Sequence, residues 1–272
     1  MQCLQTKFIC VALLLMAGCG NQPSTPAVPL YIETITLKEK LANQDIANAN
    51  YREALEAYQA VYIQYLKIDS HDDMARLLVN RFQTALIIED IQAAKHAQAE
   101  LQGLLLQSRN PRYEQRLSLL SANLAMVENQ WPQALTLLAQ IPSNESTEPA
   151  LAARVNEAIV HFHQGGDISP LIQQLAPSLT AQPALVARMQ RLQAVVALQN
   201  NDNVNTAKPF ITAAKRYYQS ISFPPGVAEC MVLEAKLASL NDNTALAKQL
   251  EHRAKAIFTL IGNSHAISRH AL

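Results

Sequence analysis

The chain is poor in glycine, in aromatic residues and in net charge. It contains seven glycines, its aromatic residues make up 6% of 272 residues, and 22 basic residues balance 22 acidic ones. Few glycines and few β-branched runs argue against a sheet protein. Without a basic excess nucleic acid is not an expected partner, and without an acidic tail no solvating arm is expected.

Long hydrophobic runs are also missing. No apolar stretch reaches the roughly 18 residues that cross a bilayer as a helix. Alanine, leucine and glutamine recur instead, and these residues favour helices. We therefore expect an all-helical body of one or two domains, without a membrane-spanning helix.

Cysteine is scarce beyond the N-terminus. Cys3, Cys10 and Cys19 lie close to the start of the chain, and Cys230 is the one cysteine of the body, which therefore cannot form an intrachain disulfide. Cys230 lies in an apolar helical stretch. A small buried packing residue is its expected role, and a reactive thiol is the alternative.

The motifs of common catalytic sites are absent. The chain has no H-E-x-x-H, no G-x-S-x-G and no phosphate-binding loop. His161 and His163 are two residues apart on an expected helix, so they point to different faces and cannot share a metal ion. His265 and His270 lie in a tail without acidic neighbours. We expect no catalytic residue, no metal site and no cofactor, and we expect the protein not to be an enzyme.

The N-terminus carries a short secretion signal that ends in a cysteine. Lys7 supplies a positive charge, and the nine apolar residues 8–16 after it are too few to span a membrane. Ala17, Gly18 and Cys19 come next. This order resembles the lipobox of bacterial lipoproteins, although a methionine stands where leucine is usual. An ordinary secretory signal is the alternative.

The lipobox resemblance implies that residues 1–18 are removed and that Cys19 carries a covalent lipid, with palmitate-type acyl chains as the anchor. Two or more chains hold firmly, since each buried methylene contributes about 0.8 kcal/mol. Gly20 follows the cysteine, and the lack of aspartate there implies the inner leaflet of the outer membrane, facing the periplasm. Residues 19–31 contain three prolines and form an expected tether of roughly 35 Å.

A repeat of 36 to 40 residues runs through the rest of the chain. The stretch ANYREALEAYQAV, residues 49–61, resembles the second half of a tetratricopeptide (TPR) repeat, in which a small residue recurs at a fixed offset. Alanine there lets the two helices of a hairpin approach closely. The spacings between successive units are 40, 40, 37, 36 and 40 residues, and the residues at this offset are Ala54, Ala94, Ala134, Leu171, Ala207 and Ala247.

The prolines support this division into helix hairpins. Pro132 and Pro170 fall in the first turn of a second helix, where a missing N–H costs nothing. Ser169 is an expected N-cap, and Thr36 with Glu39 forms an expected capping box that opens the first helix. The prolines expected between units are Pro111, Pro142, Pro149, Pro177, Pro183, Pro224 and Pro225.

The TPR resemblance covers about residues 36–262 and implies an all-α, right-handed superhelical solenoid of about six hairpins. Its spacing exceeds the usual TPR length, so longer helices or loops are expected. We assign residues 32–262 to the repeat domain and 263–272 to a C-terminal tail. The tyrosine stripe Tyr58, Tyr62 and Tyr65 is expected to pack against the next unit, with a partner-binding patch as the alternative.

In TPR proteins the first helix of each hairpin lines a concave groove, and arginines there suit carboxylates and carbonyls of an extended peptide. Simple solvated positions are the alternative. The groove positions that the resemblance implies are Glu39, Asn43, Arg76, Gln83, Arg116, Asn123, Asn156, His163, Arg188 and Arg191.

These features favour a lipid-anchored scaffold that binds other envelope proteins or peptide segments. Known TPR lipoproteins include pilotins of pilus secretins, a subunit of the barrel-assembly machine and adaptors of peptidoglycan enzymes. The number of units resembles the pilotin plan most, whereas the spacing fits it badly. The competing hypothesis is a carrier or enzyme that cradles a lipid, glycan or peptide, for which a deep pocket with converging polar groups would be the sign.

Overall fold

The computed structural model describes residues 29–142, 147–199, 206–263 and 266. All secondary structure in these ranges is helical, and it comprises twelve helices. In chain order they are α2 (Leu30–Ala47), α3 (Tyr51–Leu66), α4 (His71–Ile87), α5 (Ile91–Gln107), α6 (Pro111–Val127), α7 (Trp131–Leu138), α8 (Glu148–His163), α9 (Ser169–Leu179), α10 (Pro183–Gln199), α11 (Ala207–Ser220), α12 (Pro224–Leu240) and α13 (Thr244–Leu260).

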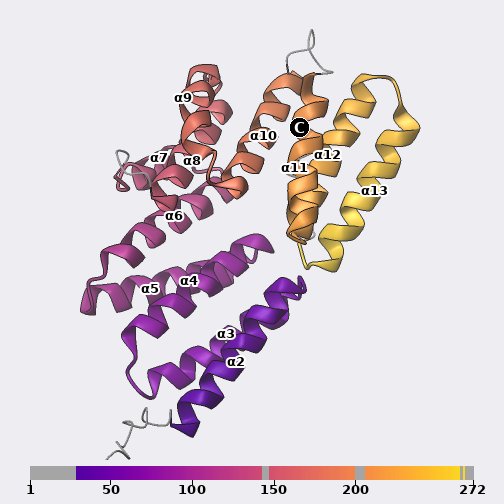
Figure 1. The fold of residues 1–272 in the computed structure, drawn as a ribbon. Coiled ribbons are helices and arrows are strands. Elements are labelled where there is room, and N and C mark those ends of the chain that lie inside the picture. Colours follow the sequence, from indigo (N-terminus) through magenta and orange to yellow (C-terminus); the bar gives the residue numbers. More distant parts are fainter. Residues whose placement is uncertain (1–28, 143–146, 200–205, 264–265, 267–272) are drawn as a thin grey trace, which may run out of the picture. The chain divides into compact units, whose positions relative to one another are not determined.

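The described residues from Leu37 onward form one compact unit, and the tertiary contacts described below lie within it. Its helices form consecutive hairpins, as the ribbon of Figure 1 shows. The first helices of neighbouring hairpins also pack on one another, α4 on α6, α6 on α8, α8 on α10 and α10 on α12. This stacking of each hairpin on its neighbours is that of a helical-repeat solenoid with TPR-like hairpins.

The alanines that define the repeat lie where the two helices of a hairpin meet. Ala54, Ala94 and Ala134 are completely buried, and each is the fourth residue of its helix. Ala247 holds the same place in α13 and is 3% exposed. A small buried residue as the fourth of its helix is thus found at four of the six predicted positions, whereas Leu171 is only partly buried on α9 and Ala207 is the first residue of α11.

Tight turns with a left-handed residue end most of these helices. The residues with positive φ are Ala49, Asp69, Glu89, Asn129, Gly165, Ser222, Asp242 and Gly262. In several turns the following N–H reaches back across the turn, as from Asp90 to the Ala85 carbonyl at 2.9 Å. This bond satisfies a carbonyl at the helix end and lets the chain reverse within three residues.

Three details of the helix boundaries differ from the prediction. The first helix begins at Leu30, so Thr36 lies inside it and its hydroxyl donates to the Ile32 carbonyl at 2.9 Å. The N-cap of α9 is Ile168, and Ser169 is already helical. Pro177 lies inside α9 and not between units. Pro132 and Pro170 occupy first turns, as predicted.

The last hairpin also packs against the first two. One cluster of buried residues joins Tyr51 and Ile88 with Met231 and Phe258. The Asn263 side-chain amide donates to the Ile87 carbonyl at 3.0 Å, across 176 residues of sequence. Asn263 is 4% exposed, so the segment assigned as a tail starts in the core. The two ends of the repeat array are in contact.

No helix within the described ranges is both long enough and apolar enough to cross a membrane.

Candidate functional site

Several of the predicted groove residues bind neighbouring hairpins together. Arg76 on α4 donates to the Glu39 carboxylate on α2 at 3.0 Å and to Asp73 at 2.7 Å. The Tyr65 hydroxyl donates to Glu39 at 3.3 Å. Glu39 is 8% exposed, and burial lowers the pKa of Arg76. This cluster ties the first hairpin to the second.

A second set of ties joins α6 to α8. Arg116 donates to Glu148 at 2.7 Å, and Asn156 donates to the Asn123 side chain at 2.7 Å. Asn156 is completely buried, and its carbonyl oxygen has no hydrogen-bond partner among the described residues.

Two other predicted groove residues, Asn43 and Gln83, form no hydrogen bond to a neighbouring hairpin among the described residues. Asn43 is exposed and accepts a bond at 2.7 Å from Tyr58, in its own hairpin. Gln83 is exposed on α4. A role of any of these residues in partner binding stays a prediction.

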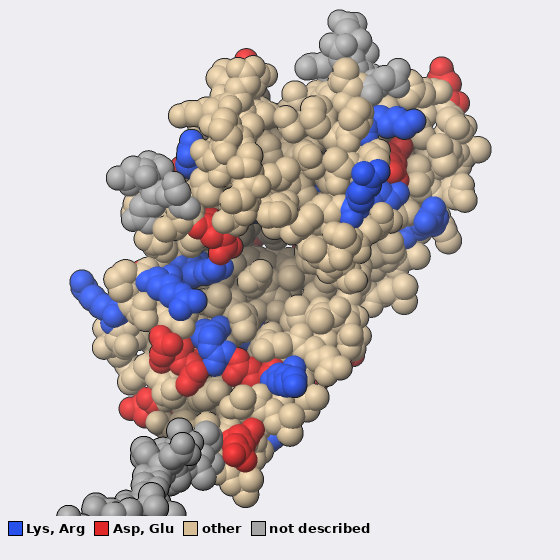
Figure 2. All heavy atoms as spheres, viewed as in Figure 1, with Lys and Arg blue, Asp and Glu red and all other residues tan. Residues whose placement is uncertain are grey.

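The remaining three, His163, Arg188 and Arg191, meet at one cavity of about 200 Å³ between α8, α10 and α12. Each of these three helices, α8, α10 and α12, is the first helix of its hairpin. Figure 2 shows a hollow near the centre of the face in view, with both basic and acidic side chains near it. Apolar side chains form most of the cavity wall, namely Ile159, Phe162, Leu192, Val195, Leu198, Val232 and Leu233.

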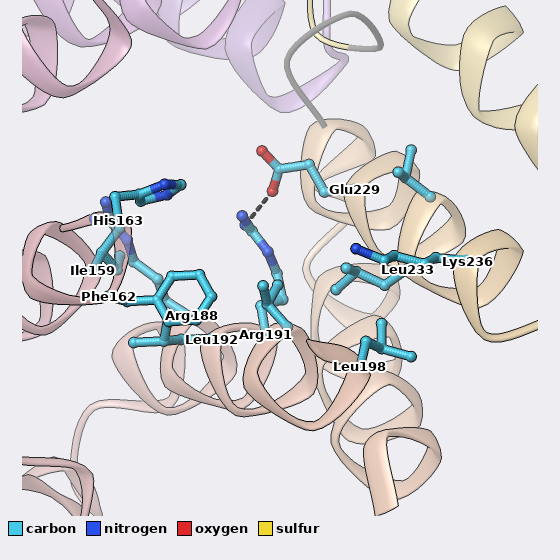
Figure 3. Close-up of a pocket in the computed structure, with 12 residues that line it drawn as sticks. Ile159, Phe162, His163, Arg188, Arg191, Leu192, Leu198, Glu229, Leu233 and Lys236 are labelled. Carbon is cyan, nitrogen blue, oxygen red and sulfur yellow. Dashed lines mark ion pairs between the residues drawn. The ribbon is translucent and has the colours of Figure 1, made fainter. Parts of the chain in front are cut away.

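Arg191 and Glu229 form an ion pair across the cavity, from α10 to α12 (Figure 3). The Arg191 guanidinium also lies 5.9 Å from the centre of the Tyr218 ring. Burial alone would lower the pKa of Arg191, but the Glu229 carboxylate and Tyr218 together raise it above its ordinary value. Arg191 therefore stays charged and fixed in place.

Arg188 and Lys236 line the same cavity without such a partner. Among the described residues, neither side chain forms a hydrogen bond within 3.5 Å or an ion pair within 4.0 Å. Burial and the charge of Arg191 lower the pKa of Arg188. The cavity thus brings three cations, Arg188, Arg191 and Lys236, to a single carboxylate, Glu229.

His163 lies at the edge of this cavity and is held by ring contacts. Its ring stacks on Trp131 with 4.3 Å between centroids and an angle of 8° between planes. Phe162 meets the same ring edge-on at 5.5 Å. These contacts fix the α8 wall of the cavity in shape.

Three predicted groove residues, His163, Arg188 and Arg191, lie on the α8 and α10 side of the cavity, whereas Glu229 and Lys236 on α12 were not predicted. A signal was available, because tied residues are about one repeat apart. The separations are 37 residues for Glu39 and Arg76, and 32 for Arg116 and Glu148. One repeat beyond Arg191, the same rule points to Glu229.

The tyrosine stripe was predicted to pack against the next unit, and Tyr62 makes such a contact, whereas the hydroxyls of Tyr58 and Tyr65 bond to α2 of their own hairpin. Tyr58 and Tyr65 are buried, and the Arg81 guanidinium of the next hairpin lies 6.0 Å from the centre of the Tyr62 ring. Cys230 is completely buried, which confirms its packing role, and burial raises the pKa of its thiol to about 12.

The described residues contain no group of His, Cys, Asp and Glu side chains that could hold a metal ion. Residues 1–28, with the expected signal, Cys19 and most of the tether, lie outside the described residues. The same is true of His265 and His270.

No protein-family model matches the chain, and no curated protein matches it in sequence. Among solved structures, it is similar to the crystal structure of PilW, described as a widely conserved type IV pilus biogenesis factor. The identity is 16%, the TM-score is 0.46, and the match covers 86% of this chain and 98% of PilW.

Proposed function

We propose that this protein is a lipid-anchored adaptor of the bacterial envelope, which binds a segment of another protein on the first-helix face of its solenoid. Cys19 would carry the lipid, and the tether would hold the hairpins near the periplasmic side of the outer membrane. The lipobox resemblance supports the anchor, and the stacked first helices support the binding face.

The observation that carries the proposal is the cavity between α8, α10 and α12. Its apolar walls suit an apolar side chain, and its excess of cations suits an acidic partner. Elsewhere on the first helices, Arg76 and Arg116 are already paired with acidic residues of this chain. The cavity therefore contains cationic side chains without an acidic partner, Arg188 and Lys236, whereas Arg76 and Arg116 are already paired.

Charge reversal tests this proposal. Lys236→Glu removes one cation from the cavity and adds an anion, whereas Lys248→Glu makes the same change at an exposed position on α13. After mild cross-linking in cells, the partner should co-purify with the unaltered protein and with Lys248→Glu, but not with Lys236→Glu. Equal recovery with both variants would contradict the proposal.

The anchor has its own test. A Cys19→Ala variant should fail to incorporate labelled palmitate and should leave the membrane fraction. If the variant stays membrane-bound and labelled, the lipobox interpretation is wrong.

A carrier of a small anionic ligand is the second candidate, because charged groups do converge on a cavity. The cavity of about 200 Å³ is smaller than the 300–1,000 Å³ of typical pockets for drug-sized molecules. This size favours a single side chain of a protein partner over a whole lipid or glycan.

A further inference from the structure

Arg188 is the unusual residue of the cavity. It is half-buried on α10, beside the apolar residues Phe162 and Leu192 that line the same cavity. In the view of Figure 3, it lies on the α8 side of the cavity, whereas Arg191 extends toward Glu229 on α12. The one carboxylate of the cavity is thus paired with the other arginine.

An unpaired guanidinium among apolar side chains is unfavourable in the free protein. Loss of water around the charge costs free energy, and Arg191 adds repulsion from a like charge, which the more weakly acting Tyr218 and Glu229 do not outweigh. A ligand that brings an anion would offset both costs by its attraction to the guanidinium, so the cavity favours one negative group. A carboxylate suits best, because the planar guanidinium can donate two parallel hydrogen bonds to it.

The size of the cavity limits what can accompany that carboxylate. A space of about 200 Å³ with aliphatic and aromatic walls accepts one apolar side chain. An acidic side chain with a separate apolar neighbour would need two residues in this space. The last residue of a polypeptide carries both groups on one Cα atom.

We propose that this cavity binds the C-terminal residue of a partner protein, with its α-carboxylate on Arg188 and its apolar side chain against Phe162 and Leu192. This inference rests on the proposed adaptor function and specifies the chemistry of its partner. Lys236 and Arg191 add positive charge around this site. Recognition is therefore expected to require a negatively charged, free carboxylate at the end of the partner chain.

The test uses fluorescein-labelled heptapeptides of polar sequence that end in valine, leucine or phenylalanine, each as free acid and as C-terminal amide. Binding to the full chain carrying Cys19→Ser is measured by fluorescence anisotropy. At least one free acid should bind roughly ten-fold or more tightly than its amide, as expected for a charge-assisted pair.

Matched variants assign the effect to Arg188. Arg188→Met should abolish the difference between acid and amide, and its melting temperature should be unchanged or higher because an unpaired charge has been removed. Arg116→Met, which alters an arginine that is tied to Glu148 outside the cavity, should keep the difference.

Three outcomes would overturn the inference: equal binding of acid and amide, no binding by any peptide, or a preference that survives Arg188→Met. Displacement of the peptide by octanoate at equal or lower concentration would also overturn it, in favour of a small-molecule carrier. If cross-linking in cells still depends on Lys236 while these peptides fail, the adaptor function stands and only the C-terminal specificity is wrong.

Discussion

At the scale of residues, the polar side chains of the first helices are mostly paired with one another. Glu39 with Arg76 and Arg116 with Glu148 are bound across hairpin boundaries. Arg188 is different because its cavity contains one carboxylate, and Arg191 binds it. The positive charge of Arg188, which has no ion-pair partner among the described residues, therefore favours binding of an anionic ligand.

Cys230 gives a residue-scale prediction about reactivity. Its thiol is completely buried, and burial raises its pKa to about 12, so the reactive thiolate is almost absent at neutral pH. In a chain with Cys3, Cys10 and Cys19 replaced by serine, a maleimide should label Cys230 in denaturant and not in the native protein at pH 8. Rapid labelling of the native protein would contradict the buried role.

At the scale of elements, the packing of α11 on α12 depends on one glycine. A Cβ atom on Gly226 would lie 2.5 Å from the Tyr218 ring, which leaves no room for a methyl group. Gly226→Ala should therefore destabilise the protein by about 1–3 kcal/mol. Since Tyr218 also supports Arg191, the same variant should weaken peptide binding in the cavity.

Gly103 provides the matched control for this substitution. It lies on an exposed face of α5, and a Cβ atom there would meet nothing within 4 Å. Gly103→Ala should stabilise the protein by about 0.5–1 kcal/mol, because alanine loses less conformational entropy in a helix. Denaturant unfolding of both variants measures the two effects, and a stability loss in both would contradict the geometry.

The links between hairpins can also be measured. A double-mutant cycle with Glu39→Gln and Arg76→Met should give a coupling free energy of about 1 kcal/mol, because Glu39 is largely buried. The same cycle on the more exposed pair Lys95 and Glu128 should give less than about 0.5 kcal/mol. Coupling of equal size in both pairs would show that burial does not set the strength of these ties.

Much of this element-scale structure could be predicted from the sequence. Recurring alanines such as Ala54 and Ala94 mark close contact within a hairpin, and that contact is local in sequence. Helix ends were less predictable, since Thr36 resembles a cap but bonds back to Ile32 within a helix that starts earlier. Ties between hairpins depend on where each side chain lies around its helix, which repeat spacing alone does not give.

At the scale of the whole molecule, contact between the ends of the repeat array was not predicted. Asn263 reaches Ile87, and the cluster around Phe258 includes Tyr51. A sequence pattern with a period near 40 residues specifies neighbours and contains no signal for contacts 176 residues apart. The closure adds buried surface between the first two hairpins and the last, so it should restrain the helices that form the cavity.

At the same scale, the function that we propose joins the anchor and the cavity: a membrane-tethered solenoid would present a cationic, apolar-walled pocket to another envelope protein. The partner is then expected to bind at this pocket and not on α13. Leu233 lines the pocket, and Lys248 lies exposed on α13, so these positions separate the two surfaces.

The most direct measurement places a photo-cross-linking phenylalanine at Leu233 or, as the control, at Lys248, in the full chain in living cells. Ultraviolet light should produce a discrete adduct with another protein from position 233 and none from position 248, and Arg188→Met should reduce that adduct. No adduct from position 233, or equal adducts from both positions, would contradict the claim that this pocket is the docking site.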